Sequence, residues 1–443
     1  MKPLMSLILA TGLLFSAPTL AIAKPTYNPT TNESIRILRD MIQIPSENNH
    51  EAQVAEYLQK VLKSHGIQAT LIPYAPGRSN LIAEIHNGSG KTLAISGHLD
   101  VVDAGNHDEW THPPFSAHID DDGVMWGRGA TDMKSGLAAL VMAMIRLNET
   151  KNFTGTVRLI ATVGEEIGEL GANQLTTLGY MDDVDGLLIA EPSSVGIIHA
   201  HKGSLNYKVT AKGVAAHSSM PATGKNAIDA LTQAMTAIND ELQQKFNTAD
   251  NAILGKGFSN VTLIKGGNQI NSIPDYAEFE ANARTVPEFD NQAVIAEIQR
   301  IINKLNSEQK LNLSLEVTAD LPPVQAKASS PLIDAIIDTV KDQPSLGVSA
   351  QFDLMQSVLK QDLSAAKQRF GKTQIAPMAV SGTTDAAQFL RHRNDIDLAI
   401  YGPGIPMLNH KVDERVPLEQ YLAFIDVYEQ VISRYLTPST ASK

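Results

Sequence analysis

Thr92-Leu93-Ala94-Ile95-Ser96-Gly97-His98-Leu99-Asp100 is the stretch around which this chain is organised. Its apolar first half predicts a short buried strand, and a histidine and an aspartate follow at the carboxyl end of that strand. In open α/β sheets, ligands and catalytic groups gather beyond the carboxyl ends of the strands. An imidazole can bind a metal there while a neighbouring carboxylate fixes its tautomer. Taken alone, His98 and Asp100 also fit an ordinary exposed turn. The rest of the chain must therefore be used to choose between a turn and a site.

The segments around this stretch alternate between strand and helix. Residues 68–72 and 80–85 have strand patterns before it, and residues 135–148, apolar almost all round, predict a buried helix after it. Further buried strands are predicted at residues 156–163 and 186–190. This alternation predicts an α/β domain with a mostly parallel, helix-covered sheet.

The pattern changes between residues 203 and 320. Strand, helix, strand, strand, helix and strand follow one another there, which is the order of a ferredoxin-like α+β domain. A Leu-Pro-Pro stretch at 321–323 marks the return to the first domain. We therefore expect a first domain made of residues 24–202 and 321–443, interrupted by the smaller one. In its second part, helices are expected at 332–341, 384–392 and 418–435, and a strand at 398–401.

Composition limits the class of protein and its partners. A chain of 443 residues is long enough for two domains, and its 43% hydrophobic and 19% charged residues are typical of a globular protein. The net charge of -12, without any basic run, argues against nucleic acid and anionic membranes as partners. The chain has no cysteine, so a transition-metal site must use His, Asp and Glu.

The first 23 residues differ from the rest. Lys2 precedes an apolar core from Leu4 to Phe15, and Ala21-Ile22-Ala23 matches a small-residue cleavage site. The apolar core is too short to span a bilayer. These features predict a signal peptide (residues 1–23) and an exported protein, periplasmic or secreted, without a membrane anchor. A buried N-terminal helix is the alternative.

Several polar residues are predicted at strand ends or in the turns after them. Each alone has an ordinary explanation, such as a helix cap or a solvated turn. Together they could supply the two histidines and three carboxylates of a site whose two metal ions lie about 3.5–4 Å apart, and one more carboxylate as general base. They are His98 with Asp100, Asp132, the pair Glu165-Glu166, Glu191 and His410.

The motifs that contain these residues occur in a recognisable order along the chain. They are Gly-His-Leu-Asp (97–100), Trp-Gly-Arg-Gly-Ala-Thr-Asp-Met-Lys (126–134), Gly-Glu-Glu (164–166), Glu-Pro-Ser (191–193), Gly-Val-Ala-Ala-His-Ser-Ser-Met-Pro (213–221), Ser-Gly-Thr-Thr-Asp (381–385) and Asn-His-Lys-Val-Asp-Glu (409–414). The series resembles the two-zinc amidohydrolase family of acetylornithine deacetylase, succinyl-diaminopimelate desuccinylase, aminoacylase and glutamate carboxypeptidase. A related group of two-zinc aminopeptidases is a weaker match, because of the inserted domain and the Glu at 191.

The resemblance implies two Zn²⁺ ions, with Co²⁺ or Mn²⁺ as possible substitutes. His98, Asp132 and Glu191 would bind one ion. Asp132, Glu166 and His410 would bind the other, so that Asp132 bridges the two. It also implies a zinc-peptidase-like catalytic domain with an inserted lid and dimerisation domain, and therefore a homodimer.

Further roles also follow from the resemblance. Glu165 would be the general base that activates the metal-bridging water, and Asp100 would orient His98. His217 would stabilise the oxyanion, in family members often in the site of a partner subunit. The substrate carboxylate and its surroundings would be bound by Asn271, Arg284, Gly382 and Thr383.

The predicted function is zinc-dependent hydrolysis of the amide bond of an N-acyl amino acid or small peptide with a free carboxylate. One alternative is a succinyl-diaminopimelate desuccinylase or acetylornithine deacetylase of amino-acid biosynthesis. The predicted signal peptide argues against that alternative and favours scavenging. A non-catalytic binding protein on the same scaffold is a further hypothesis, although it would be expected to lose some of the metal-binding residues, and all are present.

Overall fold

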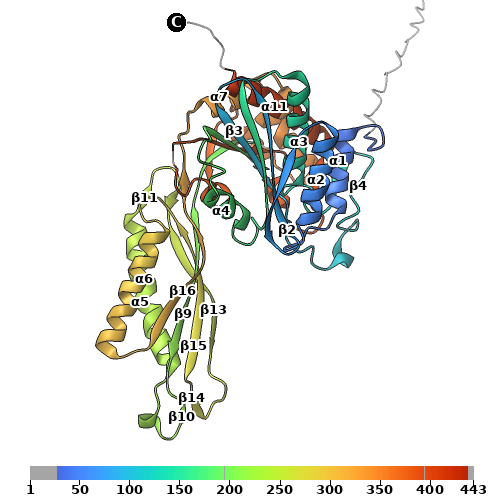
Figure 1. Ribbon diagram of the computed structural model, residues 1–443. Helices are drawn as coiled ribbons and strands as arrows, with labels where there is room; N and C mark the ends of the chain where they lie inside the picture. Colours follow the sequence, from blue (N-terminus) through green and yellow to red (C-terminus); the bar gives the residue numbers. More distant parts are fainter. Residues whose placement is uncertain (1–26, 194, 394, 438–443) are drawn as a thin grey trace, which may run out of the picture.

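The computed structural model describes residues 27–193, 195–393 and 395–437 of the protein (Figure 1). It has a larger α/β domain and a smaller domain that projects from it (Figure 1). Among the described residues, none of the helices combines the length and apolar character that crossing a membrane requires. The predicted signal peptide lies outside the described residues.

A nine-stranded sheet forms the centre of the larger domain. β3 (Thr92–His98) lies between β6 (Gly155–Thr162) and β7 (Gly186–Pro192), and β19 (Asp397–Gly402) follows next to β7. All three pairings are parallel. The α/β fold class predicted from the sequence is therefore confirmed, and β3 is a central strand whose seven residues are all buried.

The edges of this sheet are antiparallel, so the sheet is mixed rather than mostly parallel. β1 (Ala69–Ala75) and β2 (Arg78–Asn87) form one edge, where a two-residue connection is too short for a parallel crossover. At the other edge, β8 (Ile197–His201) is antiparallel to β19 and to β17 (Val324–Gln325), and parallel to β18 (Pro377–Val380).

Helices cover both faces of the sheet because successive strand residues point to opposite sides. Leu93 and Ile95 of β3 belong to one hydrophobic core, and Ala94 belongs to the core of the other face. α4 (Leu170–Thr177) and α10 (Ala386–Phe389) cover the face of Ala94. The opposite face carries α1 (Glu33–Gln43), α2 (Ala52–Ser64), α3 (Lys134–Thr150), α7 (Pro331–Lys341), α8 (Val348–Leu359) and α11 (Leu418–Leu436).

Several helices differ from the prediction, among them α4, for which no helix was predicted between the strands at 156–163 and 186–190. α8 and the short α9 (Ser364–Phe370) were not predicted, although Val348, Phe352 and Met355 are buried at helical spacing. The residue before α8 is Gly347, which provides no side-chain cap, so the usual start signal is missing. The helix predicted at 384–392 is reduced to the four residues of α10.

The smaller domain has its own sheet and core. Its strand order, β13-β15-β9-β16, is entirely antiparallel, as in ferredoxin-like domains. Both of its helices lie on one face of the sheet (Figure 1). Its elements are β9 (Gly203–Lys212), α5 (Ala227–Thr248), β13 (Phe258–Gly266), β15 (Tyr276–Thr285), α6 (Asn291–Gln309) and β16 (Leu313–Leu321).

Short elements complete the fold. β20 (Arg415–Pro417), β5 (Val124–Trp126) and β4 (His118–Ile119) form a three-stranded sheet in the larger domain. In the smaller domain, β10 (Ala216–His217) pairs with β14 (Ser272–Ile273) at the end farthest from the larger domain (Figure 1). The β11 and β12 hairpin (Asp250–Asn251 and Gly255–Lys256) lies near the junction of the two domains (Figure 1). In the described part of the chain, 3₁₀ turns occupy His107–Glu109, Pro221–Thr223, Pro344–Leu346 and Pro406–Leu408.

Candidate metal centre

The carboxyl ends of three parallel strands bring most of the predicted residues to one edge of the sheet. β3, β6 and β7 are neighbours, so groups at or just beyond their ends lie close together. The loop before β20 adds the last ligand candidate. The groups are His98 at the end of β3, Glu165 and Glu166 after β6, Glu191 in β7, Asp132 just before α3, and His410 in the loop.

Asp132 lies between the two histidines. Its Oδ1 is 3.2 Å from Nε2 of His98, and its Oδ2 is 3.3 Å from Nε2 of His410. His410 Nε2 also lies 3.0 Å from the carboxylate of Glu166, and His98 Nε2 lies 3.6 Å from that of Glu191. Each oxygen of one carboxylate thus faces a different histidine, as a ligand shared by two metal ions requires.

Asp100 contacts His98 through its backbone. His98 Nδ1 is 2.9 Å from the Asp100 carbonyl oxygen, whereas the nearest carboxylate oxygen of Asp100 is 3.7 Å away. A carbonyl only accepts, so Nδ1 carries the hydrogen and the Nε2 lone pair faces the cluster. The Asp100 carboxylate instead accepts hydrogen bonds of 3.2 Å from the backbone N–H groups of Glu165 and Glu166. Asp100 therefore holds the histidine with its main chain and orders the Glu-Glu turn with its side chain.

Glu165 lies partly buried beside the cluster. Potential ligand atoms of His98, Glu165 and Glu191 all lie within 4.8 Å of one another, as do those of His98, Asp132 and Glu166. Burial is the main cause that raises the pKa of the Glu165 carboxyl well above its usual value; His98 opposes this, and Glu191 adds to it. A carboxylate with a raised pKa accepts a proton more readily near neutral pH, as a general base must.

The donor set fits a pair of divalent cations. Imidazole nitrogens and carboxylate oxygens are ligands that Zn²⁺ prefers when no thiolate is available. Burial also raises the pKa of Glu191 well above its usual value, and the charge of Asp132 raises it further. So much negative charge in a buried place is costly without compensating cations. The residues present therefore suit metal ions on grounds of both chemistry and charge.

The residues predicted in the smaller domain lie at opposite ends of it. His217 and Asn271 are together at the tip, where His217 pairs with Ser272 and the N–H of Ser218 donates to the Asn271 carbonyl. That tip is the part of the smaller domain farthest from the larger one (Figure 1). Arg284 lies near the end of β15 in the four-stranded sheet of this domain, on the side of the junction. Within one chain, the structure does not bring His217 and Asn271 to the metal centre.

Three basic side chains gather at this junction, and we call them the junction cluster: His201, Lys202 and Arg284. Lys202 Nζ lies 5.1 Å from the ring centroid of Phe258, the residue that pairs with Arg284 across β13 and β15. Burial, together with a smaller contribution from the charge of Arg284, lowers the pKa of His201 to about 4. Burial also lowers the pKa of both Lys202 and Arg284. Among the described residues, no ion pair with a carboxylate compensates these two cations.

Gly382 and Thr383 follow β18 at the same junction. β18 pairs with β8 so that Val380 is opposite His201, and the Lys202 N–H lies 3.2 Å from the Val380 carbonyl oxygen. Gly382 is exposed and Thr383 is partly buried. The structure thus places these two predicted residues near the junction cluster.

Buried residues around the cluster were not singled out from the sequence. Asp385 accepts a hydrogen bond of 2.6 Å from Thr162, the last residue of β6. Glu414 accepts hydrogen bonds from the backbone at Asp132. Both acidic residues lie in the motifs quoted above, at 381–385 and 409–414, but no local pattern there predicts that they are buried.

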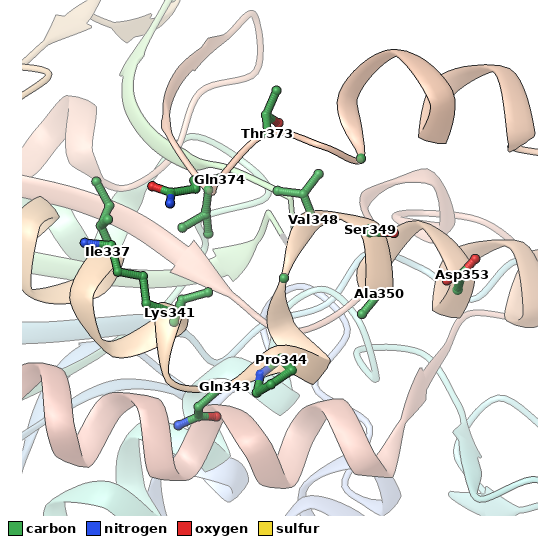
Figure 2. Close-up of a pocket in the computed structure, with 14 residues that line it drawn as sticks. Ile337, Lys341, Gln343, Pro344, Val348, Ser349, Ala350, Asp353, Thr373 and Gln374 are labelled. Atoms are coloured by element: carbon green, nitrogen blue, oxygen red, sulfur yellow. The ribbon is translucent and has the colours of Figure 1, made fainter.

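A cavity in the larger domain lies away from these residues. It has a volume of about 450 Å³ and opens between α7, the start of α8 and residues 371–375 (Figure 2). Ile337, Pro344 and Val348 line it together with Lys341 and Gln374. None of the candidate metal ligands belongs to its lining.

Comparisons with known proteins agree with this geometry. The model of peptidase family M20/M25/M40 matches residues 94–434. A probable succinyl-diaminopimelate desuccinylase from Staphylococcus aureus is 40% identical over 428 residues, which cover 91% of this chain and 98% of that protein. An M20 family metallo-carboxypeptidase from Sulfolobus solfataricus has a similar structure, with a TM-score of 0.70 and 20% identity over 91% of this chain and 99% of that one. A dinuclear metal-binding M20 peptidase from Bacillus subtilis has a TM-score of 0.61 and 18% identity, over 91% of this chain and 98% of that one.

Proposed function

We propose, from the premise that the chain belongs to peptidase family M20/M25/M40, that it is a two-zinc hydrolase of N-acyl amino acids or small peptides that carry a free carboxylate. The sequence motifs already resemble those of this family. As a member, the protein is an enzyme that acts on amide bonds. The observation that carries the proposal is the position of Asp132, whose two oxygens face His98 and His410.

The ligands follow from the same geometry. His98, Asp132 and Glu191 would hold one Zn²⁺, and Asp132, Glu166 and His410 the other. When bound, zinc supplies Lewis acidity toward the substrate carbonyl and the attacking water. The backbone contact from Asp100 keeps Nε2 of His98 free to act as a ligand.

Glu165 moves the proton in this scheme. Its carboxylate accepts a proton from the attacking water as the water oxygen bonds to the amide carbon. The same carboxylic acid then donates the proton to the nitrogen of the leaving amine as the C–N bond breaks. Burial beside the cluster raises its pKa, which makes the carboxylate a better proton acceptor near neutral pH.

The junction cluster supports an anionic substrate. Arg284 is a partly buried cation and Lys202 a buried one whose Nζ donates to the Lys256 carbonyl. No described carboxylate compensates their charges, so a carboxylate of the substrate can pair with them. The planar guanidinium of Arg284 can bind a carboxylate with two parallel hydrogen bonds. Gly382 and Thr383 lie near the same place and would contact the same end of the substrate.

We also propose a homodimer formed through the smaller domain. His217 and Asn271 lie at its tip, so they can serve only a metal centre of another subunit in this arrangement (Figure 1). The smaller domain also exposes large apolar side chains, which an interface would cover. Among them are Leu263 and Ile264 on the edge strand β13, and Ile270 beside the tip.

A biosynthetic desuccinylase is the second candidate function, because the relative from Staphylococcus aureus carries that name. The predicted signal peptide favours export, and an exported enzyme fits scavenging of acyl amino acids or peptides better than a cytoplasmic pathway. Side-chain specificity depends on the shape of the pocket, so the motifs alone do not choose between the two.

The test begins with metal-free protein prepared with a chelator. We expect it to be inactive and to regain activity on addition of two equivalents of Zn²⁺. Hydrolysis is then compared for N-succinyl-diaminopimelate, N-acetylornithine, other acyl amino acids and dipeptides, each beside its carboxamide analogue. Activity that is indifferent to chelation would exclude the metal mechanism, and equal rates on carboxylate and carboxamide substrates would exclude the role of the junction cluster.

A further inference from the structure

Glu414 is fully buried at the end of the loop that carries His410, and its carboxylate has three hydrogen-bond donors. Oε1 accepts from two consecutive backbone N–H groups, those of Thr131 at 2.8 Å and Asp132 at 2.9 Å. Oε2 accepts from Nη1 of Arg128 at 2.6 Å. One carboxylate of the His410 loop therefore holds the main chain that leads directly to the side chain of Asp132.

Arg128 connects the same loop a second time. Its Nη1 also lies 3.1 Å from the carbonyl oxygen of Lys411, the residue after His410. The N–H of Gly127 donates to the carbonyl of Glu414 at 2.9 Å, just beyond the pairing of β5 with β20. These hydrogen bonds hold the segment before Asp132 against the end of the His410 loop, although Asp132 and Glu414 lie 282 residues apart in the sequence.

The hydrogen bonds of the Glu414 carboxylate differ from those of an ion pair that serves packing alone. A buried ion pair adds little to stability, because desolvation offsets most of its attraction, and apolar residues would serve packing as well. Here the carboxylate does something that an apolar side chain could not do, since it accepts hydrogen bonds from both amides next to the shared ligand. Partners outside the direct ligands orient them and tune metal affinity.

We propose that Glu414, held in place by Arg128, is a positioning residue that keeps the carboxylate of Asp132 between His98 and His410. The inference rests on the proposed function in one respect, that Asp132 is a metal ligand. Neither Glu414 nor Arg128 needs to touch the substrate. Their effect is therefore on the assembly of the metal site.

The first test is metal binding by the Glu414→Gln variant. Metal-free protein is titrated with Zn²⁺ in a calorimeter, and the absorption spectrum of the Co²⁺ form reports ligand geometry. A glutamine places an NH₂ group against one of the three donors, so we expect Zn²⁺ affinity to fall about 10–100-fold. The control is Glu84→Gln. It removes a carboxylate of the central sheet that is bound to Arg158, and the variant should bind Zn²⁺ like the wild type.

A second variant separates positioning from simple charge. Arg128→Met removes a positive charge near the site, whereas Glu414→Gln removes a negative one. If charge alone mattered, the first would strengthen Zn²⁺ binding and the second would weaken it. Positioning predicts that both weaken it, because Glu414 loses its anchor in the arginine variant. Tighter or unchanged binding by Arg128→Met would therefore overturn the proposal.

The remaining outcomes are also decisive. Wild-type affinity in Glu414→Gln overturns the inference, while a wild-type protein that binds no Zn²⁺ overturns the proposed function instead. Circular dichroism of the metal-free proteins checks folding. If neither variant folds, Arg128→Lys carries the test, since it keeps the charge and one donor. We then expect a loss of about threefold to tenfold, and full affinity would contradict the proposal.

Discussion

Glu165 and Glu166 are adjacent residues that the structure gives different surroundings. Glu166 contacts His410, whereas Glu165 lies near His98 and Glu191. We expect Glu165→Gln to lower kcat about 10²–10⁴-fold, since the amide cannot take the proton of the water, and to leave the metal content unchanged. Steady-state kinetics and elemental analysis measure the two effects.

Glu166→Gln is the matched control for that prediction. It is expected to lose metal, because a direct contact of His410 is replaced by a poorer ligand. A Glu165→Gln enzyme with normal kcat, or one that loses metal as readily as Glu166→Gln does, would contradict the division of roles.

His201 is a single residue that makes the free energy of unfolding depend on pH. Burial lowers its pKa from 6.5 to about 4, and Nδ1 contacts the Lys202 carbonyl. Below pH 6.5 the unfolded chain therefore binds a proton that the folded protein does not bind. The wild type should lose stability from this residue as pH falls from 6.5 toward 4, by at most about 1.4 kcal/mol per pH unit.

The variant His201→Asn isolates this contribution. Its amide can donate to the same carbonyl but does not titrate. We expect the free energy of unfolding in urea, wild type minus variant, to be smaller at pH 5.0 than at pH 7.5. Parallel values at the two pH conditions would show that His201 is not held neutral by the fold.

At the scale of elements, the contact between α3 and β7 positions Glu191. A Cβ added to Gly136 of α3 would lie 2.1 Å from the carbonyl oxygen of Ala190, the residue before Glu191. Gly136→Ala should therefore push the helix away from the strand, at a cost of about 1–3 kcal/mol in stability, and weaken Zn²⁺ binding. Thermal unfolding of the metal-free protein and calorimetry measure these effects.

Gly382→Ala is the control for stability, because no atom lies within 4 Å of a Cβ built there. It should unfold like the wild type. If Gly136→Ala does so as well, and binds Zn²⁺ normally, then the close approach of α3 to β7 does not position Glu191.

Helices and strands could be predicted from the sequence where a pattern of neighbouring residues marks them. α3 was predicted almost to its ends, because a continuous apolar run bounded by polar motifs identifies a buried element. β3 was predicted at residues 92–95 and continues to His98, since its last three residues lack the apolar pattern. α8 begins at a glycine without a side-chain cap and was missed. The antiparallel edges of the sheet could not be derived from strand patterns, since strand direction depends on how the connections pass through space.

At the scale of the whole molecule, the proposed dimer can be tested by complementation. Glu165→Gln lacks the base in its own metal centre, and His217→Ala lacks a group that would act in the partner's centre. Each homodimer should be nearly inactive. In a mixed dimer, one centre has both wild-type residues, so equal mixing after dissociation should restore about a quarter of wild-type activity.

Analytical ultracentrifugation accompanies this experiment. An active wild-type monomer would contradict the dimer, and the failure of mixed subunits to regain activity would contradict action of His217 on the other subunit. Mixing Glu165→Gln with Glu166→Gln is the control. Both residues serve the centre of their own subunit, so each centre of the mixed dimer still carries one defect and activity should not return.

The α/β class, the order of the motifs and the identity of the residues that gather at the candidate metal centre could be predicted from the sequence. These are properties of local pattern and of residue chemistry, and the absence of cysteine restricted the donors further. Which atoms of these residues contact one another could be seen only in the folded molecule. The tertiary structure placed His98 and His410 on different oxygens of Asp132, gave the contact with His98 to the main chain of Asp100, and separated Arg284 from His217. The physical reason is that these contacts join segments far apart along the chain, such as Glu166 and His410 at 244 residues, and their geometry depends on packing between elements.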